Sequence, residues 1–337
     1  MHQASGSFIS CLAPEDQCLG PALMMNRSDK IYIAGHTGLV GSAVRRKLEA
    51  QGFQNLVLRS HSGLDLIRQN EVEEFFSQEK PEYVFLCAAK VGGIMANSTY
   101  PAEFIYENTM IAANVIHASY QCGVKKLLNL GSSCIYPKFA PQPMKEESLL
   151  TGELEPTNEP YAIAKIAAIK LCRYYNEQYG TNYLSVMPTN LYGPDDNFDL
   201  ETSHVLPALI RRFHEAKIAS APKVTLWGSG SPRREFLFVD DFAQACVFLM
   251  SNFNAKDIGE FVNIGTGEDI TIKELSEMVA GIIGYSGIIQ WDMTKPDGTP
   301  RKLLDVGKIR EMGWKAHTSL THGITKTYQW YENNQIL

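Results

Sequence analysis

The sequence predicts an α/β protein, a Rossmann-like doubly wound parallel sheet with a smaller C-terminal α/β lobe. Three observations predict this fold. From Lys30 onward, short β-branched or apolar runs alternate with amphipathic helical stretches, which is the pattern of repeated βα units. The first apolar run passes directly into a glycine-rich turn and then a helix. After Pro188 the composition changes, and residues 193–236 are rich in Pro, Gly, Asn, Arg and His.

The elements of the first part follow from the spacing of apolar residues. Strands are predicted at 31–34, 56–58, 83–88, 126–130 and 184–187. Between them, helices are predicted at about 39–51, 70–79, 101–122 and 159–179. The last two helices carry apolar residues on much of their surface, which indicates either a core face or a subunit interface.

The second part contains fewer elements. A single helix is predicted near 205–216, and a strand, a helix and a strand at 236–239, 241–251 and 261–264 are expected to rejoin the first sheet. A helix at 271–284 has Thr271 as a candidate N-cap with Glu274 three residues later. A strand near 288–291 and a terminal helix complete the smaller lobe.

Composition excludes several classes of protein. The 337 residues carry a formal net charge of −6, so no basic excess points to a nucleic-acid partner. The seven cysteines form no CxxC pair and no Cys/His cluster at zinc spacing, so reduced thiols, a cytoplasmic location and no metal site are expected. No stretch approaches the roughly 18 consecutive apolar residues of a membrane span. Residues 1–27 lack periodicity and a secretory pattern, and are predicted to be a disordered leader or tail.

A glycine-rich turn, Gly-His-Thr-Gly-Leu-Val-Gly, follows the first predicted strand and leads into a helix. Three glycines at this spacing allow a tight turn, close approach of the backbone to a pyrophosphate and close packing of helix on strand. The helix N-terminus adds N–H groups that favour an anion. The motif predicts a dinucleotide cofactor, held by Gly35, His36, Thr37, Gly38, Leu39, Val40 and Gly41.

Arg59, which follows the second predicted strand, bears on the choice of cofactor. NAD enzymes usually place an acidic residue there to bind the adenosine ribose. A guanidinium suits a ribose 2′-phosphate instead, so NADPH is predicted in preference to NADH. The alternative is that Arg59 is an ordinary solvated charge.

Tyr161 and Lys165 lie four residues apart, hence on one face of a predicted helix. A tyrosine of ordinary pKa about 10 is a poor acid or base at neutral pH, and a nearby lysine is expected to lower that pKa. Such a pair is common by chance. Here it follows Ser132, at the end of the fourth predicted strand, where an open α/β sheet holds its ligands. A serine there can hydrogen-bond a substrate carbonyl, which gives the three side chains a common purpose.

With these motifs the sequence resembles the extended short-chain dehydrogenase/reductases, and within them the GDP-4-keto-6-deoxy-D-mannose 3,5-epimerase/4-reductases. The resemblance runs from about Lys30 to the C-terminus. It rests on Tyr161 with Lys165 and on segments 35–42, 88–94, 131–137 and 188–194, and most specifically on 203–214. One departure is Thr37, where some members carry an arginine that helps to hold the cofactor phosphate.

The resemblance implies an enzyme with oxidoreductase and isomerase activity that converts GDP-4-keto-6-deoxy-D-mannose to GDP-L-fucose and works as a homodimer. NADPH reduces C4 of the sugar, Tyr161 protonates the forming alkoxide, Lys165 binds the nicotinamide ribose and Ser132 polarises the carbonyl. Further cofactor contacts are implied for Arg59, Leu130, Gly131, Ser132, Ser133, Pro188, Thr189, Asn190, Leu191 and His204. Contacts with the GDP-sugar are implied for Arg212, Trp227, Arg234 and Asp297.

The residue types fit those contacts, since a tryptophan offers a stacking surface and arginines offer cationic forks for a diphosphate. The alternative is a structural role, with the tryptophan as a core residue and the arginines as surface charges. The assignments divide the chain into the leader, an NADP-binding lobe over 28–190 with about 237–265, and a substrate-binding lobe over 191–236 and 266–337.

Cys134 and His204 are the candidates for epimerisation. Removing a proton next to a ketone needs a base on one face and an acid on the other, and thiol and imidazole titrate nearest neutrality. The alternative is a small buried cysteine and a structural histidine. Two rival functions stay open: another nucleotide-sugar epimerase or dehydratase of this fold, and a catalytically silent NADP-binding regulator.

Overall fold

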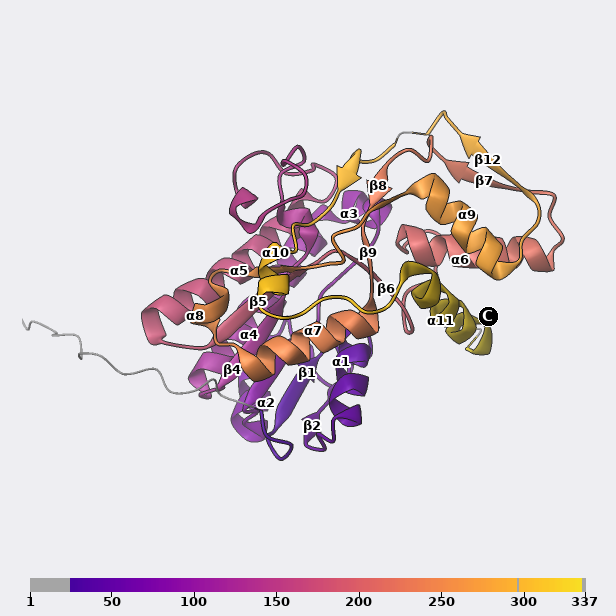
Figure 1. Cartoon of the computed structure of the whole chain (residues 1–337). Coiled ribbons are helices and arrows are strands. Elements are labelled where there is room, and N and C mark those ends of the chain that lie inside the picture. Colours follow the sequence, from indigo (N-terminus) through magenta and orange to yellow (C-terminus); the bar gives the residue numbers. More distant parts are fainter. Residues whose placement is uncertain (1–24, 296, 335–337) are drawn as a thin grey trace, which may run out of the picture.

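The computed structural model describes residues 25–295 and 297–334, so residues 1–24 of the predicted leader lie outside the described part. Its centre is a six-stranded parallel sheet of strand order β10-β5-β4-β3-β1-β2 (Figure 1). The predicted fold class is confirmed, and each strand lies within two residues of its predicted bounds. The strands are β1 (Ile31–Ala34), β2 (Leu56–Val57), β3 (Tyr83–Leu86), β4 (Lys126–Leu130), β5 (Tyr183–Pro188) and β10 (Val262–Ile264).

Helices cover both faces of this sheet, so β1, β3, β4 and β5 are buried along their whole length. Successive side chains of β1 point to opposite faces. Ile31 and Ile33 share a core with α1 (Leu39–Ala50) and α7 (Val239–Asn252). Tyr32 and Ala34 share a second core with α2 (Gln69–Glu79), α4 (Pro101–Gln121) and α5 (Glu159–Tyr179). The carboxyl edge of the sheet is left for loops.

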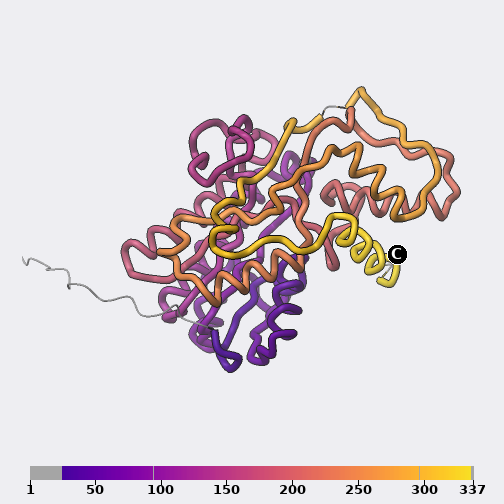
Figure 2. The backbone as a smooth tube through the Cα atoms, in the orientation of Figure 1, coloured from indigo at the N-terminus to yellow at the C-terminus, as the bar shows by residue number. Residues whose placement is uncertain are grey.

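The smaller lobe has a core of its own. Strands β7 (Lys223–Trp227) and β12 (Ile288–Asp292) pair in parallel. Helices α6 (Val205–Ile218), α9 (Ile272–Ile283) and α11 (Leu320–Asn333) pack around a third apolar cluster. The predicted start of α9 is confirmed, because Thr271 and Glu274 form a reciprocal capping box. Figure 2 shows that this lobe is assembled from segments far apart in the chain.

Short strands join the two lobes. β6 (Asn190–Tyr192) pairs with β9 (Phe236–Phe238), while β8 (Arg233–Arg234) lies between β11 (Ile270–Thr271) and β13 (Arg301–Lys302). The expectation that the whole 236–264 segment rejoins the first sheet is therefore half wrong. Only β10 pairs with β5, because β6 diverges after Pro188 and takes β9 as its own partner.

Several short elements were not predicted. They are the strands β6, β7, β8, β11 and β13, the helices α3 (Ile94–Thr99), α8 (Ala255–Ile258) and α10 (Gly307–Glu311), and the 3-10 turns η1 (Ser133–Ile135) and η2 (Glu146–Ser148). Pieces of six residues or fewer are too short for apolar periodicity to reveal. Within 25–295 and 297–334, no helix is both long and apolar enough to cross a membrane. The same ranges hold no group of three or more His, Cys, Asp or Glu side chains able to bind a metal ion.

Candidate active site

The glycine-rich turn has the shape that a dinucleotide pyrophosphate requires. Gly35 has φ +81°, and a Cβ placed on it would lie 2.8 Å from the backbone of Ala88. A Cβ on Gly41 would lie 2.1 Å from the Gly35 carbonyl oxygen. Gly38 caps α1 without a side-chain hydrogen bond, which leaves the first N–H groups of the helix for an anion. The His36 Nδ1 atom is buried without a partner, as expected of a group that awaits a ligand.

Arg59 follows β2, and its guanidinium already has partners within the protein. Its Nη2 atom bonds Glu79 Oε1 at 2.5 Å, and its guanidinium lies 5.7 Å from the centre of the Phe75 ring. The side chain is 42% exposed. A contact with a 2′-phosphate would therefore compete with Glu79, and the assignment of Arg59 to the cofactor stays a prediction.

Tyr161 and Lys165 occupy the first two turns of α5, close to the carboxyl end of β4. The Lys165 ammonium is buried, donates to the Leu130 carbonyl oxygen at 2.8 Å and lies 5.6 Å from the centre of the Tyr161 ring. Phe104 of α4 packs edge-on against that ring at a centroid distance of 6.2 Å. The phenol is thus held between two helices, with the lysine anchored to the sheet.

The expectation that Lys165 lowers the pKa of Tyr161 is not met. Burial raises the pKa of Tyr161 well above its usual range, and the electrostatic effect of Cys134 acts in the same direction. Burial lowers the pKa of Lys165 to about 8. The physical reason is that the ammonium points to the Leu130 carbonyl while both groups are withdrawn from water. Tyr161 is consequently a phenol with a proton to give.

Ser132 and Cys134 belong to the loop that leaves β4. Ser132 caps η1, and its Oγ accepts a hydrogen bond from the Cys134 backbone N–H at 3.4 Å. The Cys134 thiol is only 7% exposed, and burial raises its pKa, partly offset by a hydrogen bond to Ser132 and by the positive charges of Lys302 and Lys165. Ser132, Cys134, Tyr161 and Lys165 therefore form one cluster.

His204 comes from the other lobe, as the N-cap of α6. The residue as a whole is exposed, while desolvation by surrounding protein lowers the pKa of its imidazole. Among the described residues no hydrogen bond joins His204 to Cys134.

The remaining predicted cofactor contacts line the carboxyl edge of the sheet. Leu130 ends β4 and is followed by Gly131 to Ser133, and Pro188 ends the adjacent β5 and is followed by Thr189 to Leu191. Asn190 is anchored there, because its Nδ2 atom donates to the Glu235 carbonyl oxygen at 2.8 Å. These segments lie beside each other, as parallel strands require.

The predicted substrate residues gather at the second lobe. Trp227, at the end of β7, is 62% exposed, with the Lys295 ammonium 5.4 Å from its ring. Asp297 accepts hydrogen bonds from the backbone and hydroxyl of Ser229 at 2.9 and 2.6 Å. A Cβ on the next residue, Gly298, would lie 3.1 Å from the Arg234 guanidinium, so the chain after Asp297 passes close to Arg234. Arg212 lies two turns after His204 in α6.

Two groups in this region were missed by the sequence reasoning. Lys302 is the register partner of Arg234, and desolvation lowers the pKa of both side chains. Burial raises the pKa of Asp196 to about 7, and its Oδ2 atom is buried without a partner. Lys302 is distant in sequence from Arg234, so only the pairing of β8 with β13 reveals it.

A dinucleotide-binding sheet with serine, tyrosine and lysine at its carboxyl edge defines a class of nucleotide-dependent enzymes. The chain belongs to the NAD dependent epimerase/dehydratase family, whose model matches residues 31–265. It is 61% identical over 311 residues to GDP-L-fucose synthase 1 of Arabidopsis thaliana, covering 92% of this chain and 95% of that protein. It is 56% identical over 312 residues to GDP-L-fucose synthase of Escherichia coli, covering 91% and 97%.

A solved structure is similar over the same range. It is a GDP-mannoheptose C4 reductase from Campylobacter jejuni with NADP bound, which is 43% identical, has a TM-score of 0.85, and covers 91% of this chain and 99% of its own. The resemblance to the extended short-chain dehydrogenase/reductases is thereby confirmed.

Proposed function

We propose that this chain is an NADPH-dependent epimerase and reductase that converts GDP-4-keto-6-deoxy-D-mannose to GDP-L-fucose. The observation that carries the proposal is the cluster in which Cys134 lies with Ser132, Tyr161 and Lys165 at the carboxyl edge of the sheet. The high identity to GDP-L-fucose synthases over almost the whole chain supports it. Neither the rival epimerase or dehydratase nor the silent regulator is favoured.

The cofactor residues are assigned by shape and charge. The turn 35–41 and the free N-terminus of α1 would hold the pyrophosphate, and Lys165 would bind the nicotinamide ribose. Arg59 would meet the 2′-phosphate after releasing Glu79. When bound, NADPH supplies the hydride that reduces the C4 ketone.

Tyr161 would protonate the C4 oxygen as the ketone is reduced. Because burial raises its pKa, the phenol carries its proton at neutral pH and can donate it to an alkoxide, which is a far stronger base. Ser132 would hydrogen-bond the same oxygen and orient it. The Lys165 charge, fixed against the Leu130 carbonyl, would stabilise the phenolate that remains.

Epimerisation is assigned to Cys134 and His204. One of them removes the proton at C3 or C5, the electron pair is held on the C4 oxygen as an enolate, and the other returns a proton to the opposite face. In the free protein burial keeps the thiol protonated and desolvation keeps the imidazole neutral. The pair therefore starts with one acid, the protonated thiol, and one group able to accept a proton, the neutral imidazole. Because Cys134 and His204 belong to separate lobes, they suit proton transfer on opposite faces of the sugar ring.

The nucleotide is assigned to the second lobe. Arg234, Lys302 and Arg212 would bind the diphosphate, Trp227 offers a ring for stacking, and Asp297 would contact the sugar nucleotide. We accordingly treat 28–190 with about 237–265 as the NADP-binding lobe and 191–236 with 266–337 as the substrate-binding lobe.

We further propose a cytoplasmic homodimer without nucleic-acid or membrane partners. Helices α4 and α5 lie side by side and expose the large apolar side chains of Tyr106, Ile163 and Tyr174. Two such pairs would form a four-helix bundle across a two-fold axis. Light scattering at micromolar concentration should give the dimer mass, and a monomer mass would refute the arrangement.

The decisive experiment follows NADPH oxidation with GDP-4-keto-6-deoxy-D-mannose, with the UDP and dTDP analogues in parallel. We expect turnover with the GDP sugar and identification of GDP-L-fucose by NMR. Turnover confined to another nucleotide, or a reduced product with unchanged C3 and C5 configuration, would contradict the proposal.

A further inference from the structure

A three-stranded sheet carries Arg234 and Lys302, two of the three cations proposed to bind the diphosphate. Its central strand, β8, pairs antiparallel with β11 and in parallel with β13. Arg301 is opposite Arg233, and Lys302 is opposite Arg234. Because neighbouring residues of a strand point to opposite faces, Arg233 and Arg301 lie on one face, while Arg234 and Lys302 lie on the other.

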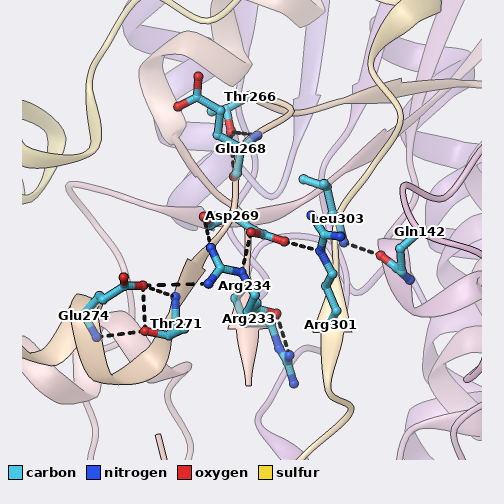
Figure 3. Close-up of polar contacts among 10 residues, drawn as sticks. All are labelled: Gln142, Arg233, Arg234, Thr266, Glu268, Asp269, Thr271, Glu274, Arg301 and Leu303. Carbon is cyan, nitrogen blue, oxygen red and sulfur yellow. Dashed lines mark hydrogen bonds and ion pairs between the residues drawn. The ribbon is translucent and has the colours of Figure 1, made fainter. Parts of the chain in front are cut away.

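Asp269, which immediately precedes β11, neutralises the first face (Figure 3). One of its carboxylate oxygens accepts from Arg233 Nε at 2.7 Å, and the other accepts from Arg301 Nε. Arg233 Nη2 also donates to the Asp269 backbone carbonyl at 3.0 Å. The carboxylate is only 5% exposed. One buried anion thus ties all three strands together, and charge-assisted bonds of this kind are the strong ones.

The second face has no such anion. In the part of the chain that the structure describes, no ion pair joins a carboxylate to Arg234 or Lys302. Arg234 donates instead to the backbone carbonyl of Arg233 at 2.8 Å. Glu155 acts on Lys302 through space but is paired with Lys138 at 3.0 Å. Two partly desolvated cations side by side repel each other, so something other than their own contacts must hold them together.

We infer that Asp269 is a positioning residue that sets the affinity for the diphosphate of the substrate. By binding Arg233 and Arg301 on one face, it fixes the register that brings Arg234 and Lys302 together on the other. An incoming diphosphate then finds two cations already ordered, and little conformational freedom is lost on binding. This inference rests on the proposed GDP-sugar substrate.

The sign of the effect separates positioning from simple electrostatics. Asp269→Asn removes a negative charge close to an anion site, so charge alone would strengthen GDP binding. Positioning predicts the reverse, because Arg233 and Arg301 would then repel each other and the strands would separate. We expect GDP affinity to fall about 10- to 100-fold, the range for losing charge-assisted hydrogen bonds.

The experiment titrates NADPH-loaded protein with GDP and with guanosine by calorimetry. Asp269→Asn should weaken GDP but leave guanosine unchanged, and Asp269→Glu, which keeps the charge, should recover most of the loss. In turnover, Asp269→Asn should raise KM with little change in kcat, since Tyr161 and Lys165 lie in another lobe. Glu274→Gln is the matched control. It removes an exposed charge 3.9 Å from Arg233, and should leave GDP affinity unchanged.

GDP binding that is unchanged or tighter in Asp269→Asn would overturn the inference. Equal losses for GDP and guanosine would also overturn it, because they would indicate general damage to the lobe. If Asp269→Asn does not fold, Arg301→Gln breaks one arm of the same contact at an exposed position, and the same selective loss of GDP is expected. Turnover of the sugar by the unmodified protein, measured in parallel, tests the proposed function separately.

Discussion

Replacing Cys134 by serine should separate the two chemical steps. The substitution changes one atom in a side chain that is 7% exposed, and it leaves the backbone bond from residue 134 to Ser132 Oγ intact. A serine hydroxyl is a far weaker acid than a thiol, so it exchanges a proton with the sugar carbon far more slowly at neutral pH. Proton transfer by a positioned side chain contributes about 10²- to 10⁴-fold in rate, so epimerisation should slow by that factor.

Reduction should survive in the same variant. The proton donor Tyr161, the charge on Lys165 and the hydroxyl of Ser132 are all retained, and none of the described hydrogen bonds of Lys165 involves Cys134. The reduced sugar should therefore keep its original configuration at C3 and C5. Binding of NADPH should be unchanged.

The measurement is mass spectrometry and NMR of the product formed in D₂O. The unmodified protein should incorporate deuterium at C3 and C5, and Cys134→Ser should not. A fully deuterated and fully epimerised product from Cys134→Ser would remove the thiol from the mechanism and leave it as a small buried side chain.

Four other outcomes are expected. Tyr161→Phe should lower the reduction rate by about 10²- to 10⁴-fold, because the packing of the ring remains while the proton donor is lost; a near-normal rate in stopped-flow would disprove its role. Arg59→Ala should weaken NADPH but not NADH, and Glu79→Gln should tighten NADPH by freeing the guanidinium; equal effects on both cofactors in a titration would show that Arg59 does not bind the phosphate. Reduction should decline as the pH rises through about 8, where the buried Lys165 loses its charge, and Lys165→Arg should abolish that decline; an identical pH profile would assign it to another group. Glu235→Ala should lower the free energy of unfolding by on the order of 3 to 5 kcal/mol, measured by urea denaturation, because its carboxylate accepts three backbone N–H groups; a loss below about 1 kcal/mol would contradict this.

The first lobe could be predicted almost completely from sequence, because its strands are short apolar runs buried on both faces and the helices between them are long. The turn at Gly35 and the pair Tyr161 and Lys165 were predictable for a related reason. Local spacing alone places them on a strand end and on one helix face.

Contacts between distant segments could not be predicted in this way. The pairing of Arg234 with Lys302 depends on the register of β8 with β13, which lie 67 positions or more apart in sequence. The high pKa of Tyr161 depends on how deeply α4 and α5 bury the phenol, and the spacing of two residues carries no information on burial. The contact between Arg59 and Glu79 likewise forms only when α2 packs on the sheet.

The exposed indole of Trp227 gives this protein a built-in optical reporter. Of the four tryptophans, Trp314 is buried and bonded to Gln244, Trp330 stacks on Phe198, and Trp291 is partly buried on the neighbouring strand β12. Trp227, at the end of β7, is the exposed one, with 62% of its surface accessible. A base that stacks on it would change its emission, and nucleotide occupancy could then be followed in real time without a labelled ligand.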